Sequence, residues 1–291
     1  MLLLAGLSAA SLALGACSGE PVDQNAANDM ATDPVEVEDV EVAPAGTDYA
    51  TILAGDQRSE ENRARDQYRH PAETLDFFGL EPGMTVVEIA PGNGWYTEIL
   101  AGAVGPDGKL VLGHSDPESS DRARQAVDTF QTKLDGNPVY GNTTLAVFSP
   151  GTDKMDTVPA GTADMVLTFR NAHNFYMADK LDPAMASFFT MLKPGGVLGV
   201  VDHRLPEEAD DEKMMSSGYM KRSTIVAAAE KAGFTLEGES EVNANPNDTA
   251  DYEKGVWSLP PTLTNGDTDR EKYIAIGESD RMTLRFRKPE A

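Results

Sequence analysis

The segment 86–97, VVEIAPGNGWYT, constrains the fold of this chain more than any other. Residues Thr85–Ile89 are β-branched or apolar apart from one acid, which predicts a short buried strand. Gly92 and Gly94 then break regular structure, and a helix is expected from about Tyr96 to Ala103. The first turn of that helix would direct free backbone N–H groups back at the glycine turn. An acid, two glycines and a helix N-terminus in this order predict a pocket for a nucleotide-type ligand.

Strand-like and helix-like segments alternate through the rest of the chain. The apolar patterns predict further strands at 109–113, 143–148, 163–169, 197–201, 235–242 and 281–287. They predict further helices at 117–134, 182–192 and 219–232, and a helix or helix-turn-helix at 58–79. Five strand–helix alternations build a parallel sheet with helices on both faces. We therefore expect an α/β fold with a doubly wound, mostly parallel, seven-stranded sheet and an N-terminal helical lid.

Several segments resemble the class I S-adenosylmethionine-dependent methyltransferases. Glu88–Gly94 resembles their motif I, acid-x-Gly-x-Gly-x-Gly, with Ala90 in place of the first glycine. Leu192–Gly196, LKPGG, stands before the fifth expected strand as in that family, and the last two strands form the expected hairpin. Three further segments resemble those of a bacterial group of predicted methyltransferases: Tyr68–Leu75, Gly94–Leu100 and Tyr219–Thr224. The resemblance implies a Rossmann-like methyltransferase fold and S-adenosylmethionine as the cofactor.

The resemblance also implies where the cofactor binds, because ligands of open α/β sheets bind at the carboxyl ends of the strands. Its aminoacid part is assigned to the first strand end, with Glu88, Ala90, Gly92, Asn93 and Gly94. The acid expected to bind the ribose arrives one or two residues late, as Asp116, and the adenine amine could meet Ser149, Asp153 or Asp156. Asn171 belongs to the segment after the fourth strand, which faces both cofactor and acceptor in the family.

Methyl transfer needs in-line positioning and, for some acceptors, removal of a proton. His173 is the best candidate for the general base, because imidazole titrates near neutral pH. Tyr176 and Tyr219 could orient an acceptor, and Asn171 completes the predicted catalytic group. The alternative for His173 is a hydrogen-bonded structural histidine, and for each tyrosine it is packing with a satisfied hydroxyl.

Three of the four histidines, His114, His173 and His203, fall just after expected strands. Together with Asp116 or Asp202 they could converge on a metal ion. The alternative is coincidence, since polar residues gather at the strand ends of this fold. We expect no metal in the site.

The N-terminus predicts export. Residues 1–17 read as a signal peptide whose end, Leu14–Cys17, resembles a bacterial lipobox with Cys17 as the lipid-carrying residue. Residues 18–48 have no Lys or Arg and predict a disordered acidic linker, followed by a methyltransferase-like domain at 49–291. The mature protein is therefore expected to be lipid-anchored in the cell envelope and to face the periplasm, or to be cytoplasmic if the segment is no signal.

Charge and cysteine content exclude several classes. The formal net charge of −24 argues against nucleic acid and anionic membrane surfaces as partners, which leaves the lipid anchor as the expected membrane contact. With one cysteine, neither an intrachain disulfide nor a cysteine-based zinc site can form. The oligomeric state is left open by the sequence.

Four functions remain after this reading. The first is a methyltransferase acting on a small molecule or an envelope component. The second is a non-catalytic, lipid-anchored ligand-binding protein on the same fold, favoured by export away from the cytosol where S-adenosylmethionine is made. The third is a histidine-metal hydrolase or binder, and an NAD-dependent dehydrogenase is a distant fourth.

Overall fold

The computed structural model describes residues 46–151 and 158–290, which belong to one compact unit, Pro44–Ala291. The predicted signal peptide, the lipidation site Cys17 and nearly all of the predicted linker lie outside the described residues. So do Asp153 and Asp156, two of the residues suggested for the adenine. Within the described ranges, no helix has the length and apolar character needed to cross a bilayer.

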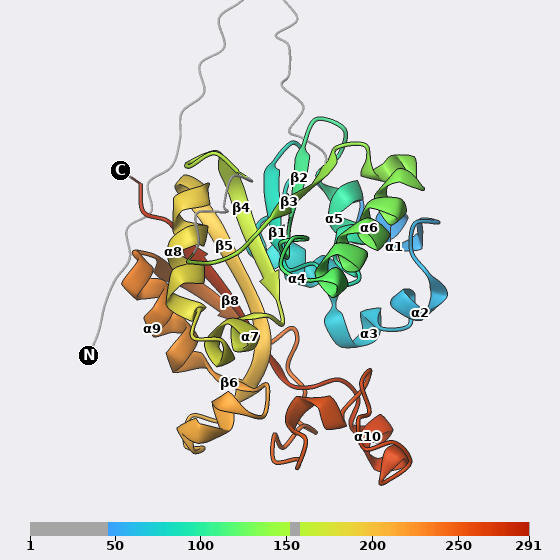
Figure 1. Cartoon of the computed structure of the whole chain (residues 1–291), viewed down its shortest axis with the longest axis vertical. Coiled ribbons are helices and arrows are strands. Elements are labelled where there is room, and N and C mark those ends of the chain that lie inside the picture. Colours follow the sequence, from blue (N-terminus) through green and yellow to red (C-terminus); the bar gives the residue numbers. More distant parts are fainter. Residues whose placement is uncertain (1–45, 152–157, 291) are drawn as a thin grey trace, which may run out of the picture. The chain divides into compact units, whose positions relative to one another are not determined.

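The strands form one sheet around which the domain is built (Figure 1). They are β1 Thr85–Ile89, β2 Lys109–His114, β3 Thr143–Val147, β4 Ala163–Phe169, β5 Leu192–Leu205, β6 Met220–Lys221, β7 Thr235–Ser240 and β8 Arg281–Arg287. Their order is β3-β2-β1-β4-β5-β8-β7, and only β8 runs antiparallel to its neighbours on this path. The two residues of β6 pair with the end of β5. This arrangement confirms the predicted mostly parallel, doubly wound sheet.

Helices cover both faces of the sheet. They are α1 Tyr49–Ala54, α2 Glu60–Arg63, α3 Asp66–Arg69, α4 Pro71–Phe78, α5 Thr97–Ala103, α6 Asp121–Asp135, α7 Ala172–Met177, α8 Leu181–Met191, α9 Arg222–Ala232 and α10 Arg270–Ile276. Short 3-10 turns lie at Pro138–Tyr140, Asp211–Met215 and Gly255–Ser258. Figure 1 shows α8 and α9 on one side of the sheet and α5 and α6 on the other. The predicted helix-turn-helix at the N-terminus is the series α2, α3 and α4.

Each face of the sheet has its own apolar core. Leu75 and Phe78 of α4 pack with Ile99 and Leu100 of α5 on one face. Met185 and Phe188 of α8 pack with residues of α9 and β8 on the other, among them Ile225 and Phe286. Fully burying one such side chain stabilises the fold by roughly 1.5–3 kcal/mol. Because both faces are covered, the central strands are largely apolar, and they support the residues at their ends.

The fifth strand is longer than predicted. The sequence predicts a tight turn up to Gly196 and a strand at Val197–Val201, whereas β5 runs from Leu192 to Leu205 with an irregularity opposite β4. Its far half is held by β8, which pairs with β5 from Val197 to His203 and satisfies its backbone groups. Asp202 and His203 therefore lie within the strand, and the expectation that they follow it is wrong.

Two predicted helices begin later than expected. The helix expected from Pro117 begins at Asp121, because the Ser120 side chain accepts a hydrogen bond from the Ala123 backbone N–H and caps it there. The helix expected from Tyr219 begins at Arg222, since the two residues before it join β6. The long polar segment 243–280 contains a 3-10 turn and α10.

Candidate functional site

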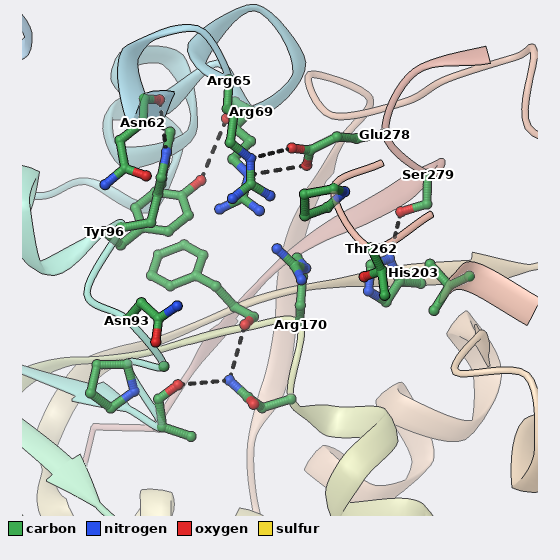
Figure 2. A pocket seen from close by; sticks show the side chains of 18 of the residues that line it. Asn62, Arg65, Arg69, Asn93, Tyr96, Arg170, His203, Thr262, Glu278 and Ser279 are labelled. Carbon is green, nitrogen blue, oxygen red and sulfur yellow. Dashed lines mark hydrogen bonds and ion pairs between the residues drawn. The ribbon is translucent and has the colours of Figure 1, made fainter. Parts of the chain in front are cut away.

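A cavity of about 630 Å³ lies at the carboxyl ends of β1 and β4. These strands are neighbours at the point where the strand order reverses, the usual ligand site of an open α/β sheet. Three parts of the chain line it: α2 and α3, the ends of the central strands, and the late segment around 256–262 and 278–279. Figure 2 shows side chains from all three parts turned toward one another. Segments from opposite ends of the chain thus close over the strand ends.

The glycine turn after β1 forms one wall of this cavity. Ala90, Gly92 and Gly94 all have left-handed backbone conformations, with φ of 52°, 60° and 81°. A Cβ added at Gly92 would meet nothing within 4 Å, whereas one at Gly94 would lie 2.8 Å from the Phe130 ring. Gly92 lines the cavity and Gly94 does not. Gly92 therefore leaves space for a ligand, and Gly94 allows α6 to pack against the turn.

Glu88 connects β1 to the first turn of α5. Its side chain is buried, and it accepts a hydrogen bond of 2.5 Å from the Thr97 hydroxyl. Burial raises the pKa of Glu88 to about 7, against the opposing effects of Thr97 and Lys133. The carboxyl group thus positions the turn and changes its charge near neutral pH.

Asn171 joins the ends of β4 and β1. Its side-chain amide donates to the carbonyl oxygens of Phe169 at 3.0 Å and Ala90 at 3.1 Å. The residue also lines the cavity. This contact fixes the glycine turn relative to the neighbouring strand end, so Asn171 has a positioning role whatever it contacts in the cavity.

His173 and Asp202 form a buried pair at the cavity wall. The Asp202 carboxylate accepts from the His173 backbone N–H at 3.0 Å and lies 2.9 Å from its Nδ1. It also accepts from the His203 backbone N–H at 2.8 Å. Because a carboxylate only accepts, Nδ1 carries the proton, and in the neutral form of the ring Nε2 is the nitrogen that accepts. This is the arrangement of a general base oriented by an acid.

His203 stands beside His173, with the two ring centroids 5.2 Å apart. Its Nδ1 lies 2.5 Å from the Ser279 hydroxyl. Burial, followed by the charges of His173 and Arg170, holds the pKa of His203 well below its usual value. His203 is therefore neutral at physiological pH.

The structure brings together only some of the residues suggested as metal ligands. Ligand atoms of His173, Asp202 and His203 lie within 4.8 Å of one another, whereas His114 lies apart, against Phe130. The Asp202 oxygens already accept three N–H groups, and the positive charges of nearby arginines act on this cluster. Such a field raises the energy of a dication and lowers that of an anion. We therefore assign no metal to this cluster.

Arginines gather over the cavity. Arg65 and Arg69 each place Nε on the Glu278 carboxylate, at 2.7 and 3.0 Å. Arg69 also lies over the Trp95 ring, 4.6 Å from its centroid. Arg170 follows β4 and turns its guanidinium toward the same space (Figure 2). Burial lowers the pKa of Arg69 to about 9 and that of Arg170 to about 10, so both stay charged at neutral pH.

Comparison with known proteins gives sequence relatives and fold neighbours. No model of a protein family matches the chain. A ubiquinone/menaquinone biosynthesis C-methyltransferase, UbiE, from Saccharophagus degradans is 30% identical over 140 residues, which cover 48% of this chain and 51% of the relative. UbiE from Hydrogenovibrio crunogenus is 27% identical over 128 residues, covering 44% and 45%. The chain thus spans about half the length of the curated relatives it matches.

Solved structures share the fold at low identity. A SAM dependent methyltransferase from Aquifex aeolicus has a TM-score of 0.50 and 16% identity, covering 77% of this chain and 93% of its own. The cyclase SpnF has a TM-score of 0.52 and 15% identity, covering 86% and 88%. Over about half of its length the chain is thus similar in sequence to C-methyltransferases, and it shares its fold with a SAM dependent methyltransferase of known structure. The cyclase among the neighbours illustrates that this fold alone does not decide a reaction.

The cavity fits the cofactor of the class I methyltransferases in part. Of the residues predicted to bind it, Glu88, Ala90, Gly92, Asn93 and Asn171 line the cavity. The open space at Gly92 suits close approach of a ligand to the backbone. Gly92 and Asn93 also line an adjoining hollow of about 400 Å³ against α6. The turn therefore suits the aminoacid part of S-adenosylmethionine, as the resemblance implies.

Other predicted site residues lie elsewhere. Asp116 does not line the cavity, and its carboxylate accepts from the Glu118 backbone N–H in the loop before α6. Tyr176 lies one turn beyond His173 along α7 and lines a different, open hollow with Asp179 and Leu181. The Tyr219 hydroxyl is held by Asp248. The structure thus separates Asp116 and Tyr176 from the residues around His173.

Several cavity residues escape the sequence reasoning. The group comprises Arg65 and Arg69 and the late residues Trp257, Thr262 and Glu278. The role of Asp202 as partner of His173, behind the cavity wall, is missed as well. One signal was present, because the long segment 243–280 is of the length that usually serves a function. Arg65 and Arg69 gave none, since an arginine on a charged helix is most often exposed.

Proposed function

We propose that this chain is an S-adenosylmethionine-dependent methyltransferase that acts on a small molecule, which could be a component of the cell envelope. The observation that carries the proposal is that the glycine turn and His173, whose ring is paired with Asp202, line one cavity. The turn is the expected cofactor wall, and the pair is a base with its orienting acid. The sequence relatives, which are named C-methyltransferases, support the reaction class.

The residues of the chain have distinct tasks in this proposal. S-adenosylmethionine supplies an electrophilic methyl group on a sulfonium. Gly92 and Asn93 bind the cofactor at the end of β1, and Asn171 holds that turn in place. Nε2 of His173 accepts a proton from the acceptor, and Asp202 stabilises the resulting imidazolium through Nδ1. The aromatic residues around the cavity, Tyr96 and Trp257 among them, exclude water.

Calorimetry with S-adenosylmethionine and S-adenosylhomocysteine tests the cofactor. We expect the purified protein to bind both ligands. If it bound neither, the proposal would be refuted. A Gly92→Val variant should bind neither, because its side chain would occupy the space beside the turn.

A second candidate is a non-catalytic ligand-binding protein on this fold. It is favoured by the position of Asp116, the acid predicted to bind the ribose, outside the cavity. Methylated product that depends on His173 and Gly92 would eliminate this candidate. In either form the protein is proposed to be anchored in the envelope through Cys17, and metabolic lipid labelling of that cysteine is the test.

A further inference from the structure

We infer that Arg65, Arg69 and Arg170 form an anion-binding subsite for the methyl acceptor, and hence that the acceptor carries a carboxylate or a phosphate group. The inference deepens the proposed function and rests on it. It follows from three observations: the charge balance of the cluster, its unsatisfied donors and its place beside the proposed base.

The cluster carries more positive than negative charge. Glu278 pairs with Arg65, Arg69 and Arg281, at distances of 2.7, 3.0 and 3.3 Å. Burial would raise the pKa of Glu278, but the three arginines lower it to about 2, so the carboxylate is ionised. Arg170 forms no ion pair within the described residues. Three guanidinium groups therefore share one carboxylate, and Arg170 adds a fourth positive charge that interacts with Glu278 and Asp202 only at a distance. This excess of positive charge stands in a chain whose net charge is −24.

The cluster also holds donors that no described residue satisfies. Buried nitrogens without a hydrogen-bond partner are Nη2 of Arg65, Nη2 of Arg69 and Nε of Arg170. The Arg69 residue is only 4% exposed, so solvent reaches little of it. An unmade hydrogen bond at a buried donor costs about 1–3 kcal/mol. An anion would satisfy these donors, and the guanidinium fork matches the two oxygens of a carboxylate or a phosphate.

The subsite suits the acceptor better than the cofactor. The aminoacid end of S-adenosylmethionine carries one carboxylate and one ammonium, so it brings no net negative charge to offset the arginines. An ammonium is moreover repelled by them. Arg170 lies three residues before His173, and its charge acts on neighbouring His203. An acceptor that gives its proton to His173 would place a nearby acidic group against Arg170.

Inorganic phosphate serves as the probe. The purified protein is first saturated with S-adenosylhomocysteine in chloride-free buffer and is then titrated with phosphate. Calorimetry should detect phosphate binding. Arg170→Gln should weaken phosphate binding by roughly tenfold to a hundredfold, the range for hydrogen bonds to a charged group. The phosphate affinity of Arg170→Lys should lie between those of wild type and Arg170→Gln, because lysine keeps the positive charge but lacks the paired N–H donors of the guanidinium group. The affinity for S-adenosylhomocysteine should stay within about threefold, since tenfold would correspond to a lost contact.

The matched control is Arg222→Gln. Arg222 pairs with Glu239 at the surface and does not line the cavity, so the variant removes one charge without touching the subsite. It should leave phosphate binding unchanged. Retained S-adenosylhomocysteine binding and an unchanged circular dichroism spectrum show that a variant is folded.

The outcomes separate the two proposals. Phosphate that competes with S-adenosylhomocysteine would assign the arginines to the cofactor carboxylate and overturn the inference. Phosphate binding that is equal in wild type and Arg170→Gln would overturn it as well. A domain that binds phosphate through Arg170 but binds neither S-adenosylmethionine nor S-adenosylhomocysteine would support the anion subsite and refute the methyltransferase.

Discussion

Asp202 contacts His173 at two points, through Oδ2 to the backbone N–H at 3.0 Å and through Oδ1 to the ring Nδ1 at 2.9 Å. One carboxylate therefore fixes both the start of α7 and the orientation of the imidazole. Asp202 itself is fully buried in β5, so it has little freedom to move. The imidazole of His173, the proposed base, is therefore held by the sheet.

Asp202→Asn should lower kcat by about 10²–10⁴, the usual contribution of a general base. The asparagine amide can donate to Nδ1, so the ring would protonate at Nε2, the wrong nitrogen for the proposed reaction. Nitrogen NMR of the labelled imidazole reports the tautomer without any acceptor. A wild-type tautomer and an unchanged kcat in this variant would contradict the assignment. Asp164→Asn is the matched control, because Asp164 caps the opposite ends of β1 and β5 through Thr85 and Lys193.

Comparison of Gly92→Val with Gly83→Val separates the effect of backbone strain from the loss of cofactor binding. Both glycines have left-handed φ, 60° and 86°, and a Cβ at either would meet nothing within 4 Å. The strain of a side chain there is about 1–2 kcal/mol in each case. Only Gly92 lines the cavity. Calorimetry should find S-adenosylhomocysteine binding lost in Gly92→Val and retained in Gly83→Val; equal affinities would remove the turn from the site.

Ala90→Gly should raise the free energy of unfolding by about 1 kcal/mol, because alanine pays for a left-handed conformation that glycine adopts freely. Ala90 has a φ of 52° at the first glycine position of the motif. Chemical denaturation gives the value. The control Ala186→Gly, on the exposed face of α8, should lower it by about 1 kcal/mol. Destabilisation of both variants would show that Ala90 is not strained.

Glu88→Gln should change how stability depends on pH. The pKa of Glu88 is about 7 in the folded protein, above the ordinary value of 4.5. Between these values the folded chain holds a proton that the unfolded chain has released, so stability falls as pH rises through this window. The loss amounts to about 3 kcal/mol at most for a shift of this size.

Urea unfolding at several pH values, with the variant compared to wild type, isolates this contribution from other titrating groups. The amide keeps an acceptor for the Thr97 hydroxyl and does not ionise. The difference in stability between variant and wild type should therefore grow in favour of the variant from pH 4.5 to 7. A constant difference would mean that Glu88 is ionised throughout.

The parts of the fold that depend on local patterning could be predicted from the sequence. The glycine turn is one: strand, breakers and helix follow one another within a dozen residues, and the structure places Glu88, Gly92 and Asn93 on the cavity. The parallel sheet is another, because each apolar run identifies its own strand. The end of β5 could not be read in this way, since its last residues are held by pairing with β8.

The site depends on contacts that span the chain. Arg69 looks like a surface residue of a charged helix, and it is buried because Glu278, 209 positions later, lies against it. Asp202 becomes the partner of His173 only once β5 lies beside β4. Tyr176 shares a segment with His173, but the turn of α7 carries it to another hollow. Closeness in the sequence thus did not predict which side chains share the cavity, because tertiary contacts determine it.

The placement of β8 between β5 and β7 has a consequence for biosynthesis. Glu278 and Ser279 enter the cavity immediately before this strand, and β8 aligns the part of β5 that carries Asp202 and His203. A nascent chain that has just produced α9 already contains the glycine turn, both site histidines and all three cavity arginines. It still lacks Glu278, whose carboxylate accepts hydrogen bonds from both Arg65 and Arg69. The cavity can consequently be completed only after translation has passed Arg287.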